Sequence, residues 1–213
     1  MLILDILQEI STYLQQGRAK NVKTLVQEAL DAGIAADKIL QEGLLHGMDI
    51  IGVKFKNNEV YVPEVLVAAR AMNMGMEILK PHLAEAGVKA KGKVVIGTVA
   101  GDQHDIGKNL VKMMMEGKGL EVIDLGVDVP AETFVQAAID NNAEIIACSA
   151  LLTTTMVSIK SIVEKAKEMG IRDKVKIMIG GAPVTQDFCN EVGADCYRPD
   201  AASAAEAAVE LLG

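Results

Sequence analysis

Apolar residues within residues 1–88 recur three and four positions apart, the spacing that places side chains on one face of an α-helix. Gly17 and Gly33 interrupt this pattern, and Pro63 stands at the first position of a further helical run. The pattern therefore predicts four antiparallel helices packed as a small bundle. The positions that define three of the faces are Ile3, Leu7, Ile10 and Leu14; Leu40, Leu44, Met48, Ile51 and Phe55; and Val65, Ala69, Met72, Met76, Leu79 and Leu83.

The pattern changes after a short linker at residues 86–92. Five short apolar runs then alternate with helix-like segments, which predicts a parallel sheet covered on both faces. We expect an α/β plus all-α chain, with a four-helix bundle over residues 1–88 and a five-stranded Rossmann-like or flavodoxin-like domain over residues 89–213. The predicted strands are 93–99, 121–125, 144–148, 175–179 and 195–197, and the predicted helices are 106–117, 131–140, 155–169, 186–193 and 201–212.

Composition narrows the classes of partner. The net charge of −8 and the lack of a Lys/Arg cluster argue against binding of nucleic acid, which requires a cationic surface. No apolar run reaches the roughly 18 residues of a membrane span, so we expect no membrane partner. Cys148, Cys189 and Cys196 lack the spacing of paired ligands, and we expect reduced, buried thiols in a cytoplasmic protein.

Chemistry-bearing residues gather in three loops that follow predicted strands: residues 101–107, 149–155 and 180–183. Ligands of α/β folds bind at this edge of the sheet. The first loop contains His104, and Asp102 lies two residues before it, where a carboxylate can hold the imidazole in one tautomer. The second loop is rich in hydroxyl groups and the third begins with a glycine pair. The loops together predict a ligand site around His104.

Three common kinds of site do not match these loops. A phosphate-binding loop needs four residues between its glycines and Ser or Thr after its lysine, but Gly101 and Gly107 are separated by five and Asn109 follows Lys108. A zinc site needs three or four ligands, and no second His or Cys has obvious reach. Ser149 lacks the flanking glycines of a hydrolase elbow. A structural loop histidine is the remaining alternative.

The motifs Asp102-x-His104-x-x-Gly107, Ser149-x-Leu151 and Gly180-Gly181, in this order, resemble the cobalamin-binding signature of methyltransferase corrinoid proteins. The loop from Gly101 to Asn109 is similar to the matching loop of cobalamin-dependent methionine synthase. In the helical half, Gly52-Val53-x-Phe55 and the run Tyr61–Val65 are similar to the cap that precedes this domain in that family. The resemblance covers nearly the whole chain.

The resemblance implies a role for each matching residue. His104 would be the lower axial ligand of cobalt, and Asp102 would hold its other ring nitrogen. Thr155 stands where the family has a serine that completes the relay, and its methyl group is a departure that affects the geometry. Ser149 would bond the buried nucleotide tail of the cofactor. The implied cofactor-binding set in this domain also contains Leu151. Its other members are the glycines Gly107, Gly180 and Gly181, and these glycines would leave room for that tail.

The resemblance also implies a lid over the upper face of the corrin. Phe55, Val62 and Val65 fall where the family covers that face, with Val62 in place of the Leu that is common in methionine synthase. The same three residues also fit an ordinary bundle core. Residues 86–92 would then act as the hinge through which the cap moves aside.

The function implied is that of a methyl carrier without a complete active site and without catalytic residues of its own. Cobalamin would accept a methyl group at Co(I) from a substrate-specific methyltransferase, with methanol, methylamine, quaternary amine or methoxyarene as donor. The resulting methylcobalamin would serve a second methyltransferase with tetrahydrofolate or a thiol as acceptor. A reductive activator is a further implied partner. A cobalamin-dependent sensor and a mutase small subunit are the alternatives, although no basic DNA-binding segment is present.

Overall fold

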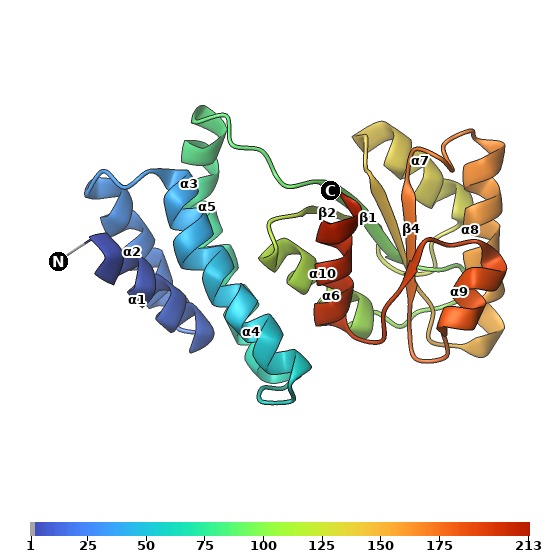
Figure 1. Cartoon of the computed structure of the whole chain (residues 1–213), viewed down its shortest axis with the longest axis horizontal. Helices are drawn as coiled ribbons and strands as arrows, with labels where there is room; N and C mark the ends of the chain where they lie inside the picture. The colour runs from blue at the N-terminus through green and yellow to red at the C-terminus, as the bar shows by residue number, and fades with distance from the viewer. Residues whose placement is uncertain (1–2) are drawn as a thin grey trace. The chain divides into compact units, whose positions relative to one another are not determined.

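The computed structural model describes residues 3–213, and these divide into two compact units. The first unit comprises the chain up to Ala90 together with Gly117–Gly119, and the second comprises Lys91–Glu116 and Leu120–Gly213. Figure 1 labels the α-helices of both units and several of the strands. All five strands of the described chain belong to the second unit.

The first unit is helical. Its elements are α1 (Ile3–Gln15), α2 (Ala19–Asp31), α3 (Ala36–Lys38), the π-helical segment η1 (Ile39–Leu45), α4 (His46–Lys56) and α5 (Val62–Glu85). Because α3, η1 and α4 follow one another without a break, the described residues form the four helical stretches that the apolar pattern predicts. Ile10, Leu14 and Leu44 are fully buried, as their spacing indicates.

The π-helical segment within the third helical stretch was not predicted. Leu40, Leu44 and Met48 are four residues apart, which is wider than the 3.6 residues of an α-helical turn. A π-helix bonds residue i to i+5 and so takes more residues per turn. This geometry keeps all three side chains buried on one face, with Leu44 and Met48 exposed by only 0% and 2%.

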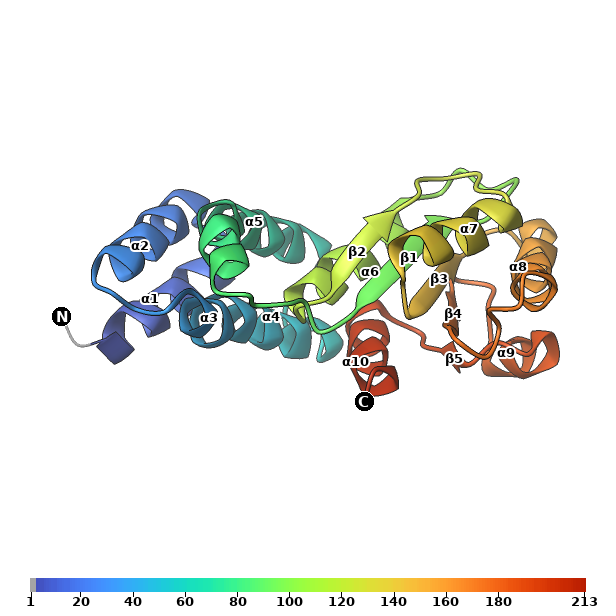
Figure 2. The ribbon, with the colours of Figure 1, turned by 90° about the horizontal axis from the view of Figure 1, so that it is seen from above.

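The second unit contains one parallel sheet in the order β2-β1-β3-β4-β5, which Figure 2 shows from above. The strands are β1 (Lys93–Thr98), β2 (Glu121–Asp124), β3 (Ile145–Ser149), β4 (Lys176–Gly180) and β5 (Cys196–Tyr197). The helices are α6 (Ile106–Gly117), α7 (Ala131–Asn141), the short 3₁₀ turn η2 (Thr153–Thr155), α8 (Val157–Glu168), α9 (Gln186–Val192) and α10 (Ala201–Leu211). In Figure 1, α7, α8 and α9 cover one face of the sheet, and α6 and α10 cover the other.

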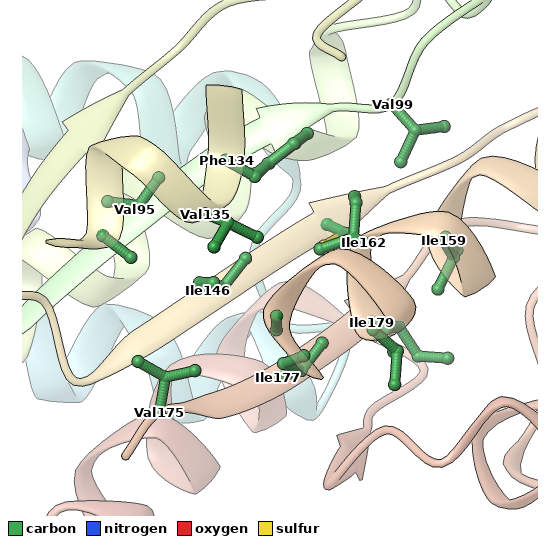
Figure 3. Packing of buried hydrophobic residues seen from close by; sticks show 14 of the residues in the cluster. Val95, Val99, Phe134, Val135, Ile146, Ile159, Ile162, Val175, Ile177 and Ile179 are labelled. Carbon is green, nitrogen blue, oxygen red and sulfur yellow. The ribbon is translucent and has the colours of Figure 1, made fainter. Parts of the chain in front are cut away.

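The core between the sheet and the helices α7 and α8 is apolar and consists mainly of aliphatic side chains. Val95, Ile146 and Ile177, from three neighbouring strands, face Phe134 of α7 and Ile162 of α8, as Figure 3 shows. These five side chains are fully buried. Burial of side chains of this size contributes about 1.5–3 kcal/mol each, so this layer holds the strand ends in fixed positions.

The strand order creates a topological switch point between β1 and β3. The chain leaves β1 toward α6 on one face and leaves β3 toward α8 on the other. In open α/β sheets ligands bind where the connections diverge in this way, at the carboxyl ends of the strands. The order found is the flavodoxin-like one of the two that the sequence left open.

Candidate functional site

The three loops singled out in the sequence lie together at the carboxyl edge of the sheet. The backbone N–H groups of Leu151 and Leu152 donate to Oδ2 of Asp102 at 2.8 and 3.1 Å, which joins the first loop to the second. The third loop approaches so closely that a Cβ atom on Gly181 would lie 1.9 Å from the carbonyl oxygen of Ala150. The predicted clustering of the loops is confirmed.

The carboxylate of Asp102 accepts the hydrogen bonds that join the first loop to the second. Its side chain is 0% exposed. Its Oδ1 accepts hydrogen bonds from Nδ1 of His104 at 2.7 Å and from the His104 backbone N–H at 3.1 Å. Its Oδ2 accepts from the two leucine amides and from Oγ1 of Thr155 at 2.8 Å. Burial alone would raise the pKa of Asp102, but these bonds hold it well below its usual range, so the carboxylate is ionised.

Thr155 bonds to Asp102 despite its extra methyl group. Its Cγ2 lies 3.4 Å from the position that a Cβ atom of Gly101 would take. The methyl group therefore lies beside the first loop at a distance that is an ordinary van der Waals contact. Gly101 also has a φ of +84°, in the left-handed region that glycine adopts readily. The hydroxyl of Thr155 completes a His104–Asp102–Thr155 chain of hydrogen bonds.

The imidazole of His104 is bound on one nitrogen and open on the other. Nδ1 meets an ionised carboxylate, which favours the tautomer with the proton on Nδ1. The side chain is 50% exposed, and no described residue bonds to Nε2. This leaves the Nε2 lone pair available to a metal, with Asp102 fixing the orientation of the ring, which is the usual arrangement around metal-bound histidines.

Two further hydroxyl groups hold the first loop in place, and neither was predicted from the sequence. Oγ1 of Thr98, which is fully buried at the end of β1, donates to the carbonyl oxygen of His104 at 2.7 Å. Oγ of Ser158 donates to the carbonyl oxygen of Ala100 at 3.1 Å. The one available signal was a hydroxyl residue, Thr98, that follows the apolar run Val94–Ile96 at the end of β1.

Lys108 is engaged in structure rather than free for a phosphate. It is 3% exposed, and its Nζ donates to Asp124 at 2.6 Å and to Asn109 at 2.7 Å. Burial of Asp124 acts to raise its pKa, but its bonds to Lys108 and the Gly126 amide outweigh this and lower the pKa. The ion pair between Lys108 and Asp124 joins the start of α6 to the end of β2. This structural role of Lys108 is consistent with the mismatch between its loop and a phosphate-binding loop.

The glycines of the motifs differ in why they are needed. Gly107 has no atom within 4 Å of the place where a Cβ atom would stand, and the nearest atom at Gly180 is the Arg198 carbonyl oxygen at 3.9 Å. Gly107 therefore faces open space in the protein itself, and a Cβ atom at Gly180 would make only an ordinary van der Waals contact. Gly181 is different, since the backbone of Ala150 fills its side-chain position and its φ is +122°.

We expect Gly181→Ala to destabilise the second unit by about 2–4 kcal/mol, because it adds a backbone clash to a φ that only glycine adopts freely. Urea unfolding of the cofactor-free protein measures this. Gly180→Ala is the matched control, since its added Cβ atom meets only an ordinary contact, and its midpoint should stay near that of the wild type. Equal midpoints for the two variants would contradict the role given to Gly181.

The other predicted residues occupy two different parts of the chain. Ser149 ends β3, where no described residue bonds to its hydroxyl, and the side chain of Leu151 is exposed on the second loop. Phe55 lies in α4 and Val62 begins α5, and both are partly exposed, whereas Val65 is 0% exposed. The assignment of all five to cofactor binding stays a prediction.

Metal-binding clusters and membrane-spanning helices are both absent from residues 3–213. No group of three or more His, Cys, Asp or Glu side chains in this range could hold a metal ion by itself. No helix in the same range has the length and hydropathy needed to cross a membrane. The three cysteines are free and buried. His104 is therefore suited to a metal whose other ligands come from elsewhere, as in a macrocycle.

Comparison with known proteins agrees with this geometry. The family described as B12 binding domain matches residues 92–209, and a second family with the same description matches residues 6–80. The chain is 49% identical over 175 residues to trimethylamine corrinoid protein 1 of Methanosarcina acetivorans, covering 81% of each chain. It is 42% identical over 209 residues to the dimethylamine corrinoid protein of Methanosarcina barkeri, covering 98% of each.

A solved structure shows the same fold. The crystal structure of the methanol:cobalamin methyltransferase complex MtaBC from Methanosarcina barkeri contains a chain that matches 98% of this one. The match covers 80% of that chain, with 32% sequence identity and a TM-score of 0.89.

Proposed function

The chain belongs to the B12-binding corrinoid proteins of methyltransferase systems, and on that premise we propose that it is a methyl carrier. When bound, the corrinoid supplies a cobalt centre that takes a methyl group from one methyltransferase and gives it to another. The donor enzyme would act on methanol, a methylamine, a quaternary amine or a methoxyarene. The acceptor enzyme would methylate tetrahydrofolate or a thiol.

The observation that carries the proposal is the state of His104. Its Nδ1 is tied to a buried, ionised carboxylate and its Nε2 has no partner among the described residues. A corrin ring would supply four nitrogen ligands of cobalt, so His104 would be the one ligand that the protein has to add. The donor set found here, one histidine and no surrounding cluster, fits that requirement.

The glycines and Ser149 support a place for the nucleotide tail of the cofactor. Gly107 faces open space, a Cβ atom at Gly180 would meet only the Arg198 carbonyl oxygen at 3.9 Å, and the Ser149 hydroxyl is without a partner in the described chain. We propose that these three residues and Leu151 contact the tail. Gly181 contributes by letting the third loop approach Ala150.

We expect Gly107→Ala to separate folding from cofactor binding. The residue lies in α6 with no positive φ and open space around it, so alanine should leave the stability of the cofactor-free protein equal or higher by up to about 1 kcal/mol. A methyl group in the tail position should weaken hydroxocobalamin binding by roughly 1–3 kcal/mol, or about tenfold to a hundredfold in Kd. Urea unfolding and equilibrium dialysis test the two halves. Unchanged binding would remove Gly107 from the site.

The helical unit is proposed to act as a lid. Phe55 and Val62 are partly exposed apolar side chains, which is what a covering surface needs, whereas the full burial of Val65 suits an indirect role behind them. We propose a boundary near residue 88, with residues 86–92 as the hinge between a cap (1–88) and a cofactor domain (89–213). Uncovering the cofactor for each partner then takes a domain motion.

The proposed partners follow from the family to which the chain belongs. We propose a substrate-specific methyltransferase, a tetrahydrofolate or thiol methyltransferase, and a reductive activator that restores oxidised cobalt, all in the cytoplasm. The three buried thiols, free of disulfides, agree with a reducing compartment.

The test uses the holo-protein reduced to Co(I) and a panel of substrate methyltransferases, each with its own donor. One enzyme of the panel should convert the Co(I) absorbance to that of the methylated cofactor, and the remaining enzymes should not. A corrinoid protein known to serve one enzyme of the panel is the positive control. Failure of every enzyme to methylate this protein, while the control is methylated, would overturn the proposal.

A further inference from the structure

The loop between β2 and α7, residues 125–130, forms hydrogen bonds with the backbone on both sides of the Asp102 side chain. The N–H of Gly101 donates to Oδ1 of Asp128 at 2.7 Å, and the N–H of Asp128 donates to the carbonyl oxygen of Asp102 at 2.9 Å. A parallel bridge between Val99 and Val129 lies beside these two bonds. Because Gly101 N and the Asp102 carbonyl are both held, the direction in which the Asp102 side chain leaves the backbone is fixed.

Asp128 has an unusual backbone conformation for this role. Its φ is +54°, in the left-handed region, where non-glycine residues are uncommon and Asp and Asn are the most tolerated. Such conformations persist where the surrounding structure holds them, and they gather at functional sites. The conformation turns both the amide and the carboxylate of Asp128 toward the first loop.

The His104 loop is therefore anchored on two sides. It follows β1, which lies between β2 and β3 in the sheet. On the β3 side, the Asp102 carboxylate itself accepts the bonds of Leu151, Leu152 and Thr155. On the β2 side, Asp128 provides the anchor, and its carboxylate is the only acceptor that the described residues offer to the Gly101 amide.

We propose that Asp128 is a positioning residue for the metal-ligating histidine, because it sets the direction of the Asp102 carboxylate and through it the orientation of the His104 ring. Asp128 bonds to the backbone of Gly101 and Asp102 and makes no hydrogen bond to His104 itself. The inference rests on the proposed function, since it gives the histidine its role as ligand. It gives the β2–α7 loop a role in the site, although this loop lies outside the three motifs.

Two substitutions test the carboxylate of Asp128 separately from its left-handed backbone conformation. Asp128→Asn keeps an acceptor oxygen and tolerates the left-handed conformation, so it is the conservative variant. Asp128→Gly adopts the same φ freely and is expected to fold, but it removes the acceptor. Asp173→Asn is the charge control, because Asp173 is an exposed carboxylate in the turn before β4, at the opposite edge of the sheet.

The first readout is solvent exchange of the His104 Nδ1 proton and of the Gly101 amide, measured by NMR on the cofactor-free protein. In Asp128→Gly both should exchange roughly tenfold to a hundredfold faster, the change expected from loss of one hydrogen bond to a charged group. Asp128→Asn and Asp173→Asn should stay within about threefold of the wild type, a difference below 1 kcal/mol. Exchange in Asp128→Gly equal to that of the wild type would overturn the proposal.

The second readout is the share of hydroxocobalamin-loaded protein with a histidine nitrogen on cobalt. Asp128→Gly should lower this share at saturating cofactor, and Asp128→Asn should restore most of it. A wild type without histidine ligation would defeat the proposed function, but the exchange rates of the cofactor-free protein would still decide the role of Asp128. A normal wild type with an unaffected Asp128→Gly variant would defeat this inference alone.

Discussion

His104→Ala should bind hydroxocobalamin without any histidine nitrogen on cobalt. The wild-type protein offers one nitrogen, Nε2, and the chain has only two other histidines, His46 and His82, both exposed on helices of the first unit. Loss of residues that merely orient a metal ligand costs about tenfold to a hundredfold in affinity. Loss of the ligand itself should cost at least as much. Equilibrium dialysis gives the affinity, and the absorbance spectrum of the loaded protein gives the ligation state.

The matched control is His82→Ala, which removes an exposed histidine from α5 and should leave both the affinity and the spectrum unchanged. His104→Ala should cost the cofactor-free protein no more than about 1–3 kcal/mol, since Asp102 loses one of its five hydrogen bonds and the half-exposed ring contributes little buried area. A His104→Ala spectrum identical to that of the wild type would mean that another group binds cobalt. The site would then have to be assigned again.

Asp102→Asn should be the most destabilising single change in the site. The carboxylate accepts five hydrogen bonds, two at Oδ1 and three at Oδ2, and is fully buried. An asparagine has one acceptor oxygen, so its NH₂ group must face either His104 or the donors of the second loop. Buried donors left without acceptors cost about 1–3 kcal/mol each, and breaking a buried charged network typically costs about 3–5 kcal/mol. We expect a loss of about 3–5 kcal/mol in the cofactor-free protein, measured by urea unfolding.

Asp105→Asn is the control for this change, because Asp105 lies in the same loop but is exposed and bonds only the nearby helix residue Asn109 at its side chain. Its unfolding midpoint should be close to that of the wild type. Asp102→Asn should also weaken histidine ligation of hydroxocobalamin, since its single acceptor oxygen cannot serve both Nδ1 of His104 and the donors of the second loop. Wild-type stability in Asp102→Asn would show that the five bonds to the carboxylate contribute no net stability.

Much of the fold could be predicted because hydrophobic periodicity is a local property. β1 was predicted at 93–99 and lies at Lys93–Thr98, and α6 was predicted at 106–117 and lies at Ile106–Gly117. A run of β-branched residues followed by a turn with glycines leaves few alternatives to a buried strand. The π-helical segment Ile39–Leu45 was missed, since the periods tested were those of the α-helix and the strand.

The site was predictable only as far as its residues are close in sequence or belong to known motifs. Asp102 and His104 are two residues apart, and their bond follows from that spacing. The partnership of Asp128 with Gly101 joins loops after β2 and β1, so it depends on the strand order. Alternation of strands and helices does not determine that order. The same holds for Gly181, whose close approach to Ala150 depends on β3 and β4 being neighbours.

The most direct test of the central claim is the EPR spectrum of the protein loaded with cobalamin in the Co(II) state, prepared with and without nitrogen-15 histidine. If Nε2 of His104 is the lower ligand, the axial nitrogen splitting will change from a triplet in unlabelled protein to a doublet in the labelled protein. The doublet will be absent from labelled His104→Ala. A triplet that persists in the labelled wild type would show that the cofactor's own base stays on cobalt, and it would contradict the account.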